Sequence, residues 1–224
     1  MSASIVDLHI VKGKTLELAL FVGEEERVMK PITAITNYAP VTLTVVGHGL
    51  VDDWEIEISG IQRPNSLNTD ENAPSSTCGG SLRVSAAERA KSYRVRVVDA
   101  DTITLFNVNG TSLQTYTSGG VVEFNKPSDL TGCEARAQLR RRTNDVEEVL
   151  SFYSSGLDEY DAAGGVVEVD VANSRYILRL PAAVAETLPV CTGVWDAEYI
   201  TADDDVYSLV AVSPFSITGE VTRG

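Results

Sequence analysis

Apolar and polar residues alternate with a period of two along much of the chain. Eight segments show this pattern, each with one apolar and one polar face: 16–22, 41–45, 54–58, 93–97, 135–140, 167–171, 176–180 and 195–199. Such alternation predicts β-strands that bury one face, and it is typical of antiparallel sheets. Valine and threonine make up about a fifth of the chain, and their branched side chains also favour strands.

Turn-forming residues separate these segments. Asp, Asn, Ser and Gly cluster at 99–101, 107–110, 118–120, 163–165 and 203–205, where they supply the backbone angles of tight hairpins. Only two helices are predicted: 85–92, which opens with a Ser cap, and 181–188, which opens with Pro181. The sequence therefore predicts an all-β protein built as a sandwich or a barrel.

Two proline-containing segments, Lys30-Pro31 and 125–127, lie between strand patterns and predict domain boundaries. The polar stretch 62–81 contains prolines, glycines and several Asn and Ser residues. It predicts a long loop and not a linker between domains, because strand patterns resume after it.

Composition and charge narrow the range of partners. The chain has 224 residues, of which 43% are hydrophobic and 22% charged, as in ordinary globular proteins. Its 32 acidic and 18 basic residues give a formal net charge of −14, which argues against nucleic acid as a partner. The start lacks the basic and apolar regions of a signal peptide, and no apolar stretch predicts a membrane span. We therefore expect assembly in a cytoplasm.

The middle of the chain resembles a known small β-barrel module. The resemblance covers most of 33–122 and is carried by Gly47-His-Gly-Leu50, the strand patterns at 54–61 and 93–105, and 118–122. This module recurs in bacteriophage tail proteins and is similar in fold to the first catalytic-cysteine half-domain of ubiquitin-activating enzymes. The insertion 63–90, which contains Cys78, departs from the family pattern, and Cys78 has no His or Asp partner nearby.

The flanking segments resemble an immunoglobulin-like sandwich of phage baseplate and tail-fibre attachment proteins. The matching segments are 7–18, 127–132, 135–140, the Gly164-Gly165 turn and 195–199. We therefore expect a discontinuous sandwich, 1–30 and 124–224, with a small β-barrel, 31–123, inserted between its early strands. Chains tolerate such insertions at exposed loop tips. Pairing of 16–22 with the barrel strands would contradict this topology.

No motif predicts a catalytic, cofactor-binding or metal-binding residue, and we expect a protein that is not an enzyme and has no cofactor. His9 and His48 are far apart in sequence, and His48 lies between two glycines, where a solvated or capping role is favoured over a general base. Cys78, Cys133 and Cys191 have wide spacing and no adjacent His, which favours free thiols. Hydrolytic activity that the substitution His48→Ala abolished would overturn this expectation.

Three further groups have a structural and a functional interpretation. The acidic residues at 158–161 and 203–205 supply possible calcium ligands but lack the spacing of a known loop, so solvated turns are favoured. Arg140-Arg-Arg142 ends a strand beside acidic residues, which favours a charge-balanced turn. Trp54 and Trp195 lie in alternating strands, which favours burial in the core over a sugar-binding platform.

Two hypotheses about function follow. The resemblance to phage proteins implies a structural virion protein, an assembly adaptor in the tail, baseplate or head-to-tail (collar) region. It implies other phage tail, baseplate or connector proteins as partners, a symmetric homo-oligomer, and neither nucleic acid nor a membrane. The alternative is a carbohydrate-binding or host-receptor-binding module of the phage particle.

The net charge is unequally divided between the two expected domains. The barrel, 31–123, has 10 acidic and 6 basic residues, a net charge of −4, and the sandwich has 22 and 12, a net charge of −10. If the sandwich docks to the particle, its neighbour should present a basic surface, and salt should weaken assembly.

Overall fold

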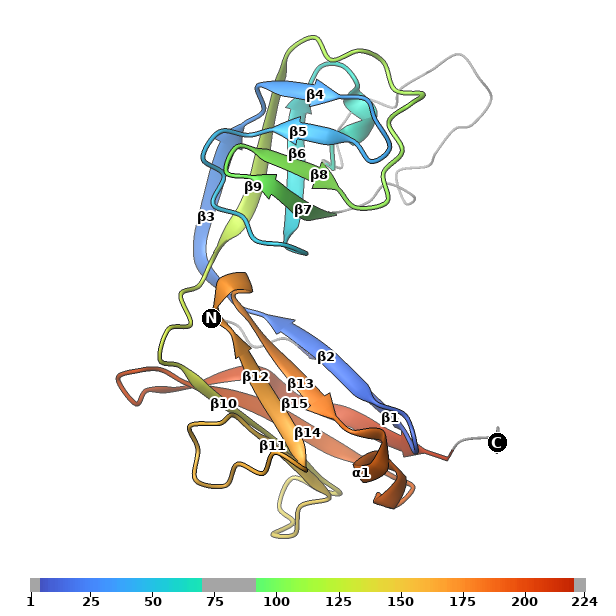
Figure 1. Ribbon diagram of the computed structural model, residues 1–224, viewed down its shortest axis with the longest axis vertical. Coiled ribbons are helices and arrows are strands. Elements are labelled where there is room, and N and C mark those ends of the chain that lie inside the picture. Colours follow the sequence, from blue (N-terminus) through green and yellow to red (C-terminus); the bar gives the residue numbers. More distant parts are fainter. Residues whose placement is uncertain (1–4, 70–91, 220–224) are drawn as a thin grey trace. The chain divides into compact units, whose positions relative to one another are not determined.

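The protein is all-β, with two sheets. A computed structural model describes residues 5–69 and 92–219 (Figure 1). The chain divides into two compact units: Gly23–Pro127 forms one, and the segments before and after it together form the other. Within the described part of the chain, no helix has the length and apolar character needed to span a membrane.

The discontinuous unit is sandwich-like and contains an eight-stranded sheet with the order β1-β15-β14-β10-β11-β12-β13-β2. Its strands are β1 (Leu8–Val11), β2 (Leu16–Phe21), β10 (Glu134–Arg140), β11 (Leu150–Tyr153), β12 (Gly165–Asp170), β13 (Arg175–Leu180), β14 (Cys191–Ile200) and β15 (Val206–Thr218). A short helix, α1 (Ala182–Thr187), follows β13, and a 3-10 turn, Val171–Asn173, follows β12.

This sheet folds over at its weakest pairing. β11 and β12 run parallel and share only two residue pairs, Phe152 with Gly165 and Tyr153 with Val166. Gly165 is required there, because a Cβ atom would collide with the backbone oxygen of Ser151. β12, β13 and β2 therefore lie in one layer, across from the layer that contains β10, β14 and β15 (Figure 1).

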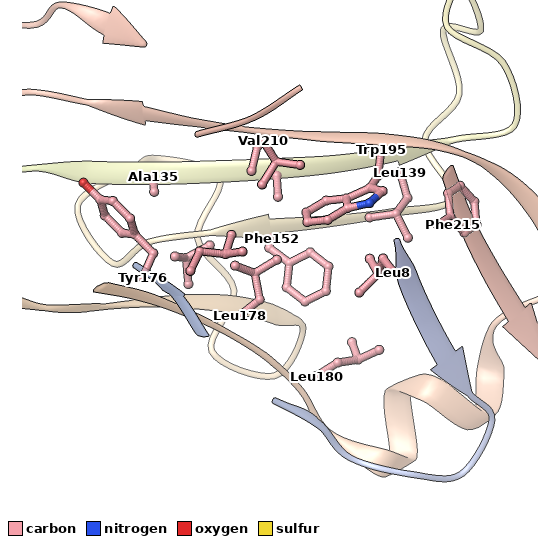
Figure 2. Close-up of a cluster of buried hydrophobic side chains, with 14 of the residues drawn as sticks. Leu8, Ala135, Leu139, Phe152, Tyr176, Leu178, Leu180, Trp195, Val210 and Phe215 are labelled. Atoms are coloured by element: carbon pink, nitrogen blue, oxygen red, sulfur yellow. The ribbon is translucent and has the colours of Figure 1, made fainter. Parts of the chain in front are cut away.

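The core of this unit fills the space between the two layers. Residues from both layers point toward one another in Figure 2, with Leu178 and Leu180 of β13 across from Leu139 of β10 and Trp195 of β14. Trp195 is only 1% exposed, and its Nε1 donates a hydrogen bond to the backbone oxygen of Val6 at 2.9 Å. The indole therefore ties the start of the chain to the core.

The unit Gly23–Pro127 contains a seven-stranded sheet that is nearly barrel-shaped, with the order β3-β9-β6-β7-β8-β5-β4. Its elements are β3 (Gly23–Pro31), β4 (Ala34–Thr36), β5 (Thr42–Thr44), β6 (Glu55–Ile61), a 3-10 turn Asn65–Leu67, β7 (Tyr93–Asp99), β8 (Thr102–Leu105) and β9 (Gly119–Pro127).

Two residues, Ile32 and Thr33, join the ends of this strand order. The Ile32 amide donates to the Gly120 oxygen on the β9 side, and the Thr33 amide donates to the Thr44 oxygen on the β5 side, each at 2.9 Å. The two edge strands of this order, β3 and β4, are therefore consecutive segments of one bent stretch of chain. The interior is filled by a separate apolar cluster around Ile58.

All eight strands predicted from period-two alternation are confirmed, as are the hairpin turn at 203–205 and the helix at 181–188. The predicted helix at 85–92 and most of the loop 62–81 lie outside the described residues. The division of the chain falls at 22/23 and 127/128, whereas the expected boundaries were 30/31 and 123/124. The difference arises because Lys30-Pro31 ends β3, which pairs with β9 over its length.

β2 pairs with β13, which lies beyond residue 125, so the pairing that would contradict an insertion is not observed.

With the boundaries of the structure, Gly23–Pro127 has 13 acidic and 9 basic residues, a net charge of −4, and the discontinuous unit again has −10.

The two ends of the discontinuous unit meet where the other unit begins and ends. The Ser128 amide donates to the Val22 oxygen at 3.1 Å. We expect a chain in which a short glycine linker replaces 23–127 to fold, because its ends are already hydrogen-bonded neighbours. Cooperative thermal unfolding and a strand-rich circular dichroism spectrum are the expected result; a random-coil spectrum would show that this unit depends on Gly23–Pro127.

Candidate functional site

The outer face of β10 and β14 presents a compact set of charged side chains. The two strands are antiparallel, with Arg136 opposite Glu198 and Gln138 opposite Asp196. The alternate residues point into the core and are buried: Ala135, Ala137, Leu139, Trp195 and Ala197. Period-two geometry therefore places Arg136, Gln138, Asp196 and Glu198 together on the outer face.

These residues line a shallow hollow of about 330 Å³, which we call the polar hollow: Arg136, Ala137, Gln138, Asp196 and Glu198. A hollow of this size lies at the lower end of the range for small-molecule sites. It is large enough for one polar side chain or a small polar group.

Each arginine beside the polar hollow is already bound to a partner. Arg136 donates to Glu198 Oε2 from Nε at 3.0 Å and from Nη2 at 2.8 Å. Arg140 Nη2 donates to Glu148 Oε1 at 2.8 Å and to Gln138 Oε1 at 2.9 Å. Arg140 Nη1 is bound to two backbone oxygens, those of Asp145 and Val146. Both guanidinium groups are thus held in fixed geometries.

Asp196 has no such partner. Among residues 5–69 and 92–219, no other residue forms a hydrogen bond or an ion pair with its carboxylate. Partial burial, followed by the charge of Glu198, raises the pKa of the Asp196 carboxyl, although Arg140 and Arg136 oppose the shift. Folding therefore places a carboxylate in a site where its charged form is poorly compensated.

A β-bulge in β15 borders the polar hollow. Trp195 pairs with Ser213 but Ala197 pairs with Val210, so two residues of β15 lie opposite Asp196 alone. Bulges bend a strand and change the direction of nearby side chains. On this outer face β15 presents Val212, which is 53% exposed, and Pro214, which is paired with Val194. An apolar border therefore lies beside the unpaired carboxylate.

His48 is buried and caps a turn, which is one of the two alternatives, solvated or capping, that the sequence predicts for it. Its Nδ1 accepts a hydrogen bond from the Leu50 amide at 2.9 Å, which requires Nε2 to carry the proton that it donates to the Asp99 oxygen at 2.8 Å. The side chain is only 3% exposed. Both ring nitrogens bind backbone groups, so His48 fixes the turn at 47–49 against the end of β7.

The other predicted candidates do not converge on one site. His9 lies in β1 and its Nδ1 is 2.8 Å from Ser216 Oγ on the exposed side of the sheet. Cys133 and Cys191 are free thiols, as predicted, and Cys78 lies outside the described residues. In the described part of the chain, no group of three or more His, Cys, Asp or Glu side chains is placed to hold a metal ion.

The acidic turns, Arg140 and the two tryptophans have the structural roles that the sequence favours: exposed turns, charge balance and burial in the core. Residues 203–205 form the exposed tip of the β14–β15 hairpin, with Asp204 at a φ of 63°. In the segment 158–161, Asp161 accepts a hydrogen bond from the Ala163 amide as a turn residue does. Arg140 is balanced by Glu148, and Trp54 and Trp195 are both buried.

Sequence reasoning identified the strands of the polar hollow but not the site. Asp196 and Glu198 were assigned only to the polar face of a strand, and Arg136 and Gln138 likewise. The missing information was the register between β10 and β14, because pairing decides which charges neutralise each other. Comparison of the sequence with protein-family models, and with curated proteins, finds no match.

Proposed function

We propose that this protein is a structural component of a bacteriophage particle, an assembly adaptor in the tail, baseplate or head-to-tail region. The proposal rests on two resemblances in the sequence, the barrel module at 33–122 and the sandwich segments around it. Both occur in proteins of phage tails or baseplates. An adaptor of this kind acts through protein–protein contacts, in a symmetric ring or a similar oligomer.

The strand order of the discontinuous unit supports an immunoglobulin-like sandwich. One layer has β15, β14, β10 and β11 in order, and the other has β12, β13 and β2. In immunoglobulin-like sandwiches the last two strands lie beside the third strand in one sheet, and the second strand lies beside the fifth in the other. Here β15, β14 and β10 have the first arrangement, and β2 and β13 have the second. The parallel pairing of β1 with β15 adds the first strand to the first layer. Trp195 is a departure, since it lies on β14 and not on β10.

The polar hollow is the observation that carries a role in binding. A face with fixed arginines, a carboxylate without an ion-pair partner and an adjoining apolar border is suited to recognition of another surface. The unit that contains this face also has the larger share of the negative charge, −10 against −4. A partner with a basic surface would complement it.

Glycan or receptor binding is the alternative function. The amide of Gln138 and the carboxylates of Asp196 and Glu198 match the groups that bind sugar hydroxyls in general. However, both tryptophans are buried and neither provides a stacking platform. We therefore favour the adaptor function.

Association with particles tests the proposal. In particles purified from cells that produce the protein, quantitative mass spectrometry should find it at a constant copy number per particle, and rising salt should release it because opposite charges hold it. A glycan array with the isolated protein is the matched test of the alternative. Absence from particles together with specific glycan binding would contradict the adaptor function.

A further inference from the structure

We propose that the polar hollow receives one lysine or arginine side chain from a neighbouring protein, which pairs with Asp196. This inference rests on the proposed function, because it specifies the chemistry of the adaptor's partner. It defines the contact as one basic side chain at one carboxylate on the outer face of β10 and β14.

The existing ion pairs leave one position for a cation. Glu198 accepts both hydrogen bonds from Arg136, and Glu148 accepts one from Arg140. Neither guanidinium moves to Asp196 without breaking those bonds. Of the two carboxylates that line the polar hollow, Asp196 is therefore the one without an ion-pair partner, and it offers an acceptor to an incoming donor.

The apolar border suits the stem of a basic side chain. Lysine and arginine place several methylene groups between the backbone and the charged head. Val194, Val212 and Pro214 lie on the same outer face as Asp196, and the bulge brings two β15 residues opposite it. A basic side chain thus covers exposed apolar surface with its stem while its head pairs with the carboxylate.

A metal ion is a poorer occupant of the polar hollow. Calcium binds six to eight oxygen ligands, and of the two carboxylates here Glu198 is already bound to Arg136. Two positive guanidinium groups nearby also disfavour a divalent cation, whereas an ammonium or guanidinium group with a single charge needs only one carboxylate.

The test uses the full chain and a side-chain analogue. We would titrate n-butylguanidinium into the ¹⁵N-labelled protein and follow backbone amide shifts by NMR, with neutral n-butylurea as the matched probe. Saturable shifts should cluster on β10, β14 and β15 around Asp196, and butylurea should bind at least about tenfold more weakly, since a charge-assisted bond is lost.

Variants locate the site. Asp196→Asn should weaken butylguanidinium binding by about tenfold or more, while Asp203→Asn, at the exposed hairpin tip, should leave it unchanged. Binding should also weaken as the pH falls and Asp196 takes up a proton; the charged groups that act on Asp196 are Glu198, Arg140 and Arg136. Shifts spread evenly over the acidic surface, or unchanged by Asp196→Asn, would overturn the inference.

A second measurement separates this inference from the proposed function. In the particle assay, Asp196→Lys should reduce incorporation at least about tenfold by placing a like charge against the partner's basic group. Normal incorporation of Asp196→Lys would overturn the inference while leaving the adaptor function intact. Failure of the wild-type protein to enter particles would instead contradict the function, whatever the probe shows.

Discussion

Replacing Trp195 by alanine should lower the free energy of unfolding of the sandwich-like unit by about 3–5 kcal/mol, the usual range for a buried tryptophan. The indole is 1% exposed and packs among residues of both layers (Figure 2). Its loss opens a cavity in the centre of the core and leaves the Val6 oxygen without its donor. No other single side chain in this core combines that volume with a hydrogen bond to the chain's first described segment.

The measurement is chemical denaturation followed by two signals. Circular dichroism reports on both units, while tryptophan fluorescence in the variant reports only Trp54 and therefore only the barrel-like unit, because the chain has two tryptophans. Circular dichroism should show an early transition, and Trp54 fluorescence should change at the wild-type midpoint. Trp195→Phe is the control and should cost less, since it keeps an aromatic ring. Coincident early transitions would contradict the independence of the two units.

The second large effect is expected from His48→Ala in the barrel-like unit. The substitution removes an acceptor from the buried Leu50 amide and a donor from the Asp99 oxygen. The Leu50 amide would be left buried and unsatisfied, which costs about 1–3 kcal/mol. The Asp99 oxygen is only partly buried and should add less, so the free energy of unfolding should fall by about 2–4 kcal/mol.

His9→Ala is the matched control, because the His9 side chain is exposed and its ring nitrogens lie beside the hydroxyl groups of Ser216 and Thr218. It should change the free energy of unfolding by less than about 0.5 kcal/mol. In a Trp195→Phe background, fluorescence comes only from Trp54 and measures the barrel-like unit for His48→Ala. Circular dichroism measures the sandwich-like unit, which contains His9, for His9→Ala. Equal midpoints for His48→Ala and wild type would show that the turn at 47–49 does not depend on the imidazole.

The strands that sequence predicts are those whose apolar side chains alternate. β10 and β14 are examples, since Ala135, Ala137, Trp195 and Ala197 all point inward at every second position. β3 does not alternate, because three consecutive glutamates, Glu24 to Glu26, follow its first residue and its pairing with β9 is irregular there. One of those glutamates, Glu24, binds Lys126 of β9 at 3.1 Å, a contact that no local pattern indicates.

The polar hollow was beyond sequence reasoning for a similar reason. A period-two pattern assigns Asp196 to the outer face but does not reveal which neighbour neutralises it. That depends on the register of β10 against β14 and on the bulge in β15, both of which arise from contacts between distant segments. His48 was placed in a turn correctly, but its burial depends on the packing of that turn against the end of β7.

A cryo-electron microscopy map of the particle tests the adaptor function most directly. We predict symmetric copies of this chain in the tail, baseplate or collar, with a lysine or arginine of a neighbouring protein in the polar hollow beside Asp196. The map would contradict the account if the chain were absent from the particle, or if it were present only as a peripheral module with bound glycan and no protein neighbour.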